Sequence, residues 1–246
     1  MPDKQSRELF QLQRFLPSLF GDVPYTLSQP SPPLPDTIIR LANRRIGIEI
    51  TTLVVDERLM QMESSQETIL SEAQRIFEQQ HQLPLHVAVS FEDRASWKKR
   101  DCKQVSVFLA NTVTQLIVNA KHLPQYQTQF EVVLEDIEHT HITRISVLYL
   151  KQLTIPCWSP QGGFWVPNAP VEEVQKIIRK KTQNVDGYLS GCDDVWLLIL
   201  ETGAQSSYFS NFEKLLPHTF ESGFAKTMIG RVSKGELMTL RPLPQL

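Results

Sequence analysis

Apolar side chains recur at helical spacing near the start of the chain and alternate with polar ones further along. Residues 5–20 place leucines and phenylalanines three and four positions apart, which predicts an amphipathic helix. Residues 36–52 alternate apolar and polar side chains around a short polar centre, which predicts a β-hairpin. Serines at 64 and 65 are candidate caps for a helix that runs to about residue 80, and a buried strand is predicted over 84–91.

A weak strand signal lies at 23–27, between the first helix and the hairpin. The same reasoning predicts alternating helices and strands after residue 91. Helices are predicted at 103–120, 171–182 and 209–216, and strands at 130–137, 142–150, 194–201, 224–232 and 236–240. No linker divides these elements. We therefore expect a single α/β domain over 1–246, with a core at about 5–91 and an elaboration at about 103–246.

Composition and charge do not indicate a function, but they narrow the possible classes of protein. The chain has 246 residues, a formal net charge of −2 and three widely spaced cysteines. The cysteines form no CxxC pair or disulfide framework, which fits a reducing compartment. Neither a signal peptide nor a membrane-length apolar run is apparent, so we expect a soluble cytoplasmic protein without membrane contact. Any nucleic-acid contact must come from local basic patches.

The hairpin places two acidic residues on one face. If Leu41 pairs with Ile46, the apolar side chains of both strands form one surface, and Asp36 and Glu49 become diagonal neighbours on the other. Their backbones would then lie about 7–8 Å apart. Two carboxylates at this separation can bind one Mg²⁺, while a solvated sheet face is the simpler alternative. Gly47 on the same face would leave room for a substrate backbone.

The sequence around these acids resembles the PD-(D/E)XK nuclease superfamily over about residues 5–91. The resemblance consists of Glu8 in the first helix, Pro35-Asp36, and Glu49-Ile50-Thr51, followed by a helix and a strand. It implies a restriction-endonuclease-like fold in which a mixed sheet is flanked by helices. It also implies that Asp36 and Glu49 bind Mg²⁺ or Mn²⁺ at a phosphodiester, with Glu8 as an accessory ligand.

One position departs from the family pattern. The lysine that usually follows the glutamate by two residues is Thr51 here, and threonine cannot supply a positive charge to activate water. A residue from a helix can take this place in the family. The sequence leaves the choice open among Gln66, Glu67, Gln74, Lys176 and Lys180. The predicted catalytic set is Asp36, Glu49, Glu8 and Lys180.

Four other clusters are candidate functional sites. His139 and His141, between two predicted strands, could ligate a transition metal, although polar residues are expected in such a turn. The basic clusters 97–103 and 177–181 could meet a phosphate backbone or form solvated helix faces. Aromatic residues in the loop 155–170 could stack on bases, but we expect them to pack over the edge of the core.

These observations predict a metal-dependent nuclease that hydrolyses phosphodiester bonds of DNA or RNA. The alternative, favoured by Thr51, is a non-catalytic module that binds nucleic acid or protein on the same fold. A metal-binding protein based on His139 and His141 ranks third. The resemblance also makes a homodimer a reasonable partner arrangement, although the sequence carries no sign of a self-complementary surface.

Overall fold

The computed structural model describes residues 4–81, 83–93, 95–119, 129–135, 141–150, 152, 154–163 and 166–243. The chain forms two compact units, one from Met1–Glu57 with Trp165–Leu246 and one from Arg58–Phe164. This differs from the single domain expected from the sequence. The reason is that the second unit is inserted between two elements of the first and has a hydrophobic core of its own.

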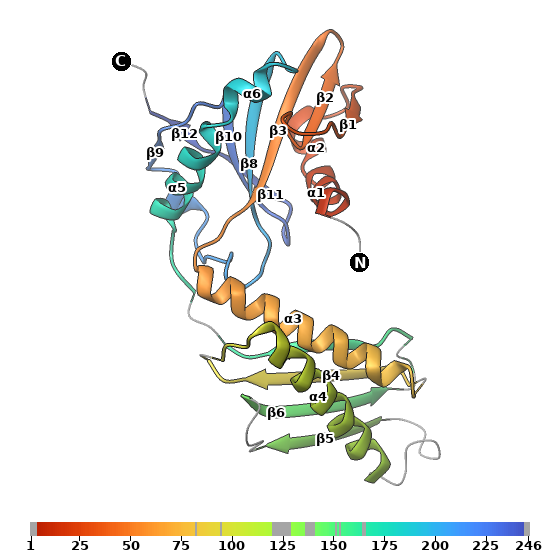
Figure 1. Ribbon diagram of the computed structural model, residues 1–246. Coiled ribbons are helices and arrows are strands. Elements are labelled where there is room, and N and C mark those ends of the chain that lie inside the picture. Colours follow the sequence, from red (N-terminus) through yellow and green to blue (C-terminus); the bar gives the residue numbers. More distant parts are fainter. Residues whose placement is uncertain are drawn as a thin grey trace. The chain divides into compact units, whose positions relative to one another are not determined.

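The first unit is built on a six-stranded mixed sheet with helices on both faces (Figure 1). The strand order is β1-β2-β3-β8-β10-β11, with β3, β8 and β10 parallel and the outer strands antiparallel. The strands are β1 (Thr26–Ser28), β2 (Thr37–Leu41), β3 (Arg44–Thr52), β8 (Asp194–Glu201), β10 (Lys226–Arg231) and β11 (Glu236–Thr239). The helices are α1 (Lys4–Gln13), α2 (Leu16–Phe20), α5 (Val171–Thr182) and α6 (Val185–Leu189). A 3₁₀ turn, η1 (Glu213–Leu215), and the short pair β9 (Thr219–Phe220) and β12 (Arg241–Pro242) complete it.

Alternation along the central strands produces a separate apolar layer on each face of this sheet. Ile46, Ile48 and Ile50 of β3 pack with α1 and α2, and they share that layer with Leu198 and Leu200. The intervening residues of β8, such as Leu197, pack with α5 and α6. Because both faces are covered, side chains of β3 that point toward α5 are buried even when they are charged.

The β2–β3 hairpin forms as predicted, but its register is two residues tighter. Leu41 pairs with Arg44, and Ile39, rather than Leu41, pairs with Ile46. A two-residue loop makes this possible, in which Ala42 adopts a positive φ of 47°. A shift of two residues keeps every side chain on its predicted face but changes which residues lie opposite one another.

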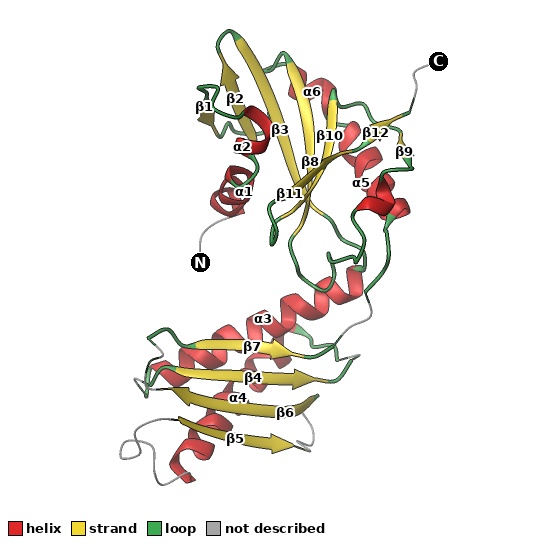
Figure 2. Ribbon diagram, turned by 180° about the vertical axis from the view of Figure 1, so that it is seen from behind, coloured by secondary structure: helices red, strands yellow, loops and turns green. Residues whose placement is uncertain are grey.

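The second unit contains a four-stranded sheet with α3 and α4 on one face (Figure 2). Its strand order is β5-β6-β4-β7. The elements are α3 (Glu57–Glu78), β4 (Leu85–Phe91), α4 (Lys99–Asn119), β5 (Gln129–Glu135), β6 (Ile142–Leu150) and β7 (Cys157–Gln161). Its core combines apolar residues of both helices with the inward side chains of β4 and β6.

The start of helix α3 and the extent of the core differ from the boundaries predicted from the sequence. The helix α3 begins at Glu57, so Ser64 and Ser65 lie within it and are not its caps. Thr68 and Ser65 instead donate to backbone carbonyls one turn earlier, as hydroxyls inside helices often do. The expected core at 5–91 is also divided, because α3 and β4 belong to the second unit. In the first unit, the helix and parallel strand that follow β3 are α5 and β8.

A buried ion pair fixes the far end of the parallel strands. Glu201 and Arg231, at the ends of β8 and β10, lie 2.5 Å apart from Oε2 to Nε and are almost fully buried. Arg231 also donates to the carbonyl of Phe209 at 2.7 Å, so the loop after β8 is held against the sheet. In the described part of the chain, none of the helices has the length and apolar character that a membrane span needs.

Candidate functional site

Asp36 lies one residue before β2, directly across the hairpin from Glu49. The pairing of Thr37 with Ile48 sets this position, so the two acids are opposite rather than diagonal. The Asp36 carboxylate accepts a hydrogen bond of 2.8 Å from the backbone N–H of Ile50. A side chain therefore takes the place of a ladder carbonyl at the end of the hairpin, and it holds the carboxylate beside β3.

Glu49 is a buried carboxylate with only 5% of its surface exposed. Lys181, at the end of α5, donates to Oε1 of Glu49 across 2.6 Å. Tyr188 of α6 provides a second hydrogen bond to this carboxylate. The two donors come from elements far along the chain that pack on the same face of the sheet as Glu49. The carboxylate is thus held from one side by β3 and from the other by α5 and α6.

Burial raises the pKa of Glu49 above its usual value, and the nearby charge of Asp36 acts in the same direction. The hydrogen bonds from Lys181 and Tyr188 oppose this shift without cancelling it. Burial together with the charge of Glu49 raises the pKa of Tyr188 to about 12, so its hydroxyl remains protonated at neutral pH. The site therefore holds two close carboxylates whose mutual repulsion favours a cation.

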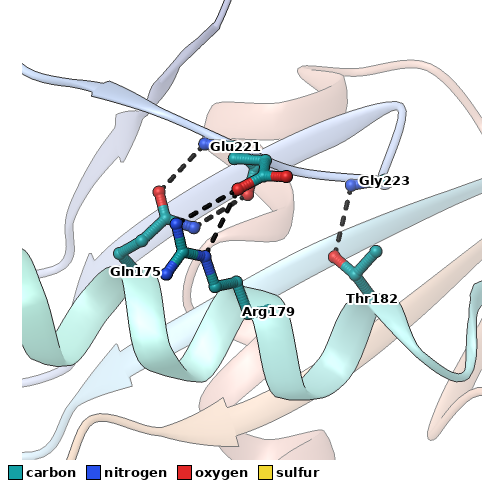
Figure 3. A network of polar contacts seen from close by, with 5 residues as sticks. All are labelled: Gln175, Arg179, Thr182, Glu221 and Gly223. Atoms are coloured by element: carbon teal, nitrogen blue, oxygen red, sulfur yellow. Dashed lines mark hydrogen bonds and ion pairs between the residues drawn. The ribbon is translucent and has the colours of Figure 1, made fainter.

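The helix that carries Lys181 is fixed by contacts to the chain just after β9 (Figure 3). Gln175 donates to the carbonyl of Glu221 and accepts from its N–H, both at 2.9 Å. Arg179 contacts the Glu221 carboxylate at 3.2 Å, and Thr182 accepts from the N–H of Gly223 at 3.2 Å. We call these contacts the α5 anchor. They bracket Lys181 along the helix, and so they set the direction in which its side chain leaves α5.

Two glycines allow the proline-rich segment 32–35 to lie directly against the site. A Cβ on Gly47 would lie 2.6 Å from Cγ of Pro35 and 2.9 Å from Sγ of Cys192. A Cβ on Gly191 would lie 2.5 Å from Cδ2 of Leu34. The sequence suggested that Gly47 makes room for a substrate. The structure fills this room with Pro35, and the close packing determines where Asp36 stands.

A pocket of about 480 Å³ opens beside the two carboxylates. One wall consists of Pro32, Pro33 and Leu34, while the carboxylates of Asp36 and Glu49 and the hydroxyl of Tyr188 form the polar part. Residues 183–187 contribute the remaining side through Gln183, Asn184 and Gly187. The pocket volume lies in the range of ~300–1,000 Å³ that is typical of ligand sites. Its chemistry combines an apolar wall, exposed amides and paired carboxylates.

The structure brings together only part of the predicted catalytic set. Asp36 and Glu49 meet, but Lys180 is exposed, and its neighbour Lys181 is the residue that reaches Glu49. The helical period explains the difference, because consecutive residues of α5 point about 100° apart. Lys176 is also exposed and lies 3.8 Å from Glu57. Glu8 lies on α1, which packs on the opposite face of the sheet from the Glu49 side chain.

The remaining candidates lie in the second unit. Gln66, Glu67 and Gln74 are on α3, and Gln66 is buried there. His141 hydrogen-bonds to Glu92 at 2.7 Å, while His139 lies outside the described residues. In the first unit, Thr51, where the PD-(D/E)XK pattern has lysine, is half-buried on β3 on the same face as Glu49.

Some residues of the aromatic loop and of the two basic clusters are buried or paired with carboxylates. Trp158 is buried against Phe77 in the core of the second unit, as expected, whereas residues 164 and 165 lie outside the described residues. In the cluster 177–181, Arg179 and Lys181 are paired with carboxylates of the first unit. In the cluster 97–103, Arg100 pairs with its neighbour Asp101.

Sequence reasoning missed Lys181 and Tyr188. Both come from a helical region that was assigned to an elaboration and not to the core. A usable signal did exist, because Lys181 follows Val174 and Ile178 by seven and three positions. Spacings of three and seven residues place Lys181 beside the buried stripe of the helix.

The donor set of the site suits a hard divalent cation. Mg²⁺ commonly takes one or two protein carboxylates and completes its shell with water and phosphate oxygens. Asp36 and Glu49 provide such a pair. Among the described residues, no group of three or more His, Cys, Asp or Glu side chains is arranged to hold a metal.

Comparisons of the chain with protein-family models, with curated proteins and with solved structures gave no match.

Proposed function

We propose that this chain is a divalent-metal-dependent nuclease, which hydrolyses phosphodiester bonds in DNA or RNA. The observation that carries the proposal is the placement of Asp36 and Glu49 on opposite strands of one hairpin, beside a pocket and in contact with a lysine. A cation held by the two carboxylates would lower the pKa of a bound water and offset charge on the phosphate.

The order of elements also supports a restriction-endonuclease-like core. The order of elements in the first unit is a helix, an antiparallel hairpin that carries both acids, then a helix and a strand parallel to the glutamate strand. This order corresponds to the resemblance stated for the sequence, with α5 and β8 in place of α3 and β4. The second unit is then an insertion within the core.

Lys181 takes the role that Thr51 cannot fill. Its ammonium group reaches the same carboxylate that a lysine two residues after the glutamate would approach along β3. A cation at this place can orient the attacking water and stabilise negative charge on the phosphate. The α5 anchor holds the helix that carries this cation, and the cation contacts Glu49, one of the residues that line the pocket.

A second candidate is a non-catalytic module that binds nucleic acid on the same fold. The close ion pair between Lys181 and Glu49 favours it, because the lysine already neutralises one of the two carboxylates. In that case the pair would be structural, and a divalent cation would have no role.

The test is a cleavage assay with single- and double-stranded DNA and RNA in the presence of Mg²⁺ or Mn²⁺. The proposal predicts metal-dependent cleavage of at least one substrate, with losses of ~10³-fold or more in Asp36→Ala and Glu49→Ala. Asp22→Ala removes an exposed acid that does not line the pocket and serves as the matched control. Binding of nucleic acid without cleavage by the unmodified chain would favour the second candidate. Equal activity in all variants would refute the site assignment.

A further inference from the structure

The pocket beside Asp36 and Glu49 has two chemically different sides. The wall formed by Pro32, Pro33 and Leu34 offers flat apolar ring faces and a branched side chain. The opposite side offers the exposed side chain of Gln183, which can both donate and accept hydrogen bonds, and that of Asn184, which is exposed and also hydrogen-bonds to Tyr188. A ligand that fits both sides has a flat apolar face and a polar edge.

One end of the apolar wall is fixed by close packing. Leu34 and Pro35 pack against two positions that have no side chain, Gly191 and Gly47, and the Asp36 carboxylate is bonded to Ile50 directly after them. The Leu34 end of the wall is therefore pre-organised for a ligand, which lowers the entropic cost of binding. By contrast, a Cβ at Gly187 would meet no atom within 4 Å, so the opposite side retains open space.

From this arrangement we infer that the pocket binds one unpaired nucleobase next to the scissile phosphate. This deepens, and rests on, the proposed nuclease function, because the same pocket contains both carboxylates. In a duplex the faces of each base are covered by stacked neighbours, and only base edges are accessible in the grooves. A wall that contacts a base face therefore requires a base outside a stack, as in single strands, loops or extruded nucleotides.

The substrate class is consequently single-stranded or locally unpaired nucleic acid. A phosphate held at the carboxylates through a divalent cation would place its adjoining nucleoside at the pocket, where the wall contacts the base face. Gln183 and Asn184 then meet the polar base edge. The site prefers an unpaired nucleotide over a paired one, with little sequence preference on the apolar side.

The experiment fills the pocket without disturbing its surroundings. Gly187→Leu places an apolar side chain in the open space on α6, and Gly162→Leu makes the same change at another glycine with open space, in the second unit. Gln183→Ala removes an exposed amide of the pocket and keeps the backbone, so it gives a second variant if the leucine alters folding. Circular dichroism checks that each variant is folded.

Two readouts separate this inference from the proposed function. The first is fluorescence anisotropy with a labelled oligothymidylate of about 12 nucleotides and a hairpin duplex, both with Ca²⁺ as the only divalent ion. The second is cleavage of the same probes, and of their RNA forms, with Mg²⁺. We expect the single strand to be bound and cleaved in preference to the duplex. Gly187→Leu should weaken binding by about tenfold and Gln183→Ala by several-fold, while Gly162→Leu should have no effect.

The outcomes are distinguishable. Cleavage of duplex and single strand at equal rates, with Gly187→Leu unchanged, would overturn the inference and leave the nuclease proposal standing. Binding of the single strand that is lost in Gly187→Leu, without cleavage of any probe, would support the pocket and refute catalysis. Absence of both binding and cleavage would overturn both.

Discussion

Lys181 on α5 donates a hydrogen bond of 2.6 Å to Glu49 on β3, across 132 positions of sequence. The insertion of a complete unit between these two elements explains the separation. As a result, the basic group of the site is absent from the segment that carries the acidic motif. The pair also gives a direct way to ask which residue replaces the lysine that is missing at Thr51.

The first prediction compares two adjacent lysines of α5. Lys181→Met should reduce metal-dependent cleavage by about 10²–10³-fold, because the cation beside Glu49 is lost. Lys180→Met removes the same charge one position earlier, where the side chain is exposed, and should change the rate by less than about threefold. Single-turnover cleavage measures both. A larger loss of cleavage rate in Lys180→Met than in Lys181→Met would mean that Lys180, the residue predicted from the sequence, is the catalytic lysine.

The second prediction concerns the packing of the proline segment. Gly47→Ala should lower the free energy of unfolding by ~1–3 kcal/mol, because its Cβ would overlap Pro35 and Cys192. Gly187→Ala meets open space and should leave stability unchanged or raise it by up to ~1 kcal/mol. Urea denaturation of both variants provides the comparison. Equal stability of Gly47→Ala and the unmodified chain would mean that Pro35 is not held against β3.

The third prediction addresses the α5 anchor. Gln175→Ala removes both hydrogen bonds to the backbone of Glu221 and should cost ~1–2 kcal/mol. Lys180→Ala on the same helix should stay within ~0.5 kcal/mol of the unmodified chain. Hydrogen exchange of α5 amides should show weaker protection in Gln175→Ala only. Identical protection in both variants would argue that the anchor does not hold α5.

The fourth prediction follows from the raised pKa of Glu49, which burial causes. A carboxyl group whose pKa is higher in the folded than in the unfolded chain contributes stability below its unfolded pKa. That contribution is lost as pH rises through the folded pKa. In metal-free buffer, the unmodified chain should therefore lose stability over this interval relative to Glu49→Gln. Urea midpoints measured across the acidic to neutral range test this, and parallel curves for the two proteins would contradict it.

Local patterns predicted most individual elements but not their grouping. The strand 194–201 and the helix 171–182 match β8 and α5, because each has a clear period and clear ends. The pattern also predicted correctly which side chains of the β2–β3 hairpin lie on each face, because the alternation of apolar and polar residues determines it. Its register was not, because a two-residue loop with Ala42 at positive φ has no strong sequence signal.

The same limit applies to the site. Asp36 and Glu49 could be predicted together because one hairpin carries both of them. Lys181 and Tyr188 depend on which helix and strand complete the sheet after β3, and this is a long-range choice that local periodicity does not encode. The sequence patterns of α3 and β4, which come next after the hairpin, fitted the expected order of a helix and then a strand as well as those of α5 and β8. Only the separate core of the second unit excludes them.

The most direct test of the account is a titration of the chain with Mn²⁺, followed by calorimetry or electron paramagnetic resonance. The central claim is that Asp36 and Glu49 bind one divalent cation between them. The account predicts a single Mn²⁺ per chain and a loss of affinity of ~100-fold or more in both Asp36→Ala and Glu49→Ala, with Asp22→Ala unchanged. Equal Mn²⁺ affinity in all four proteins would contradict it.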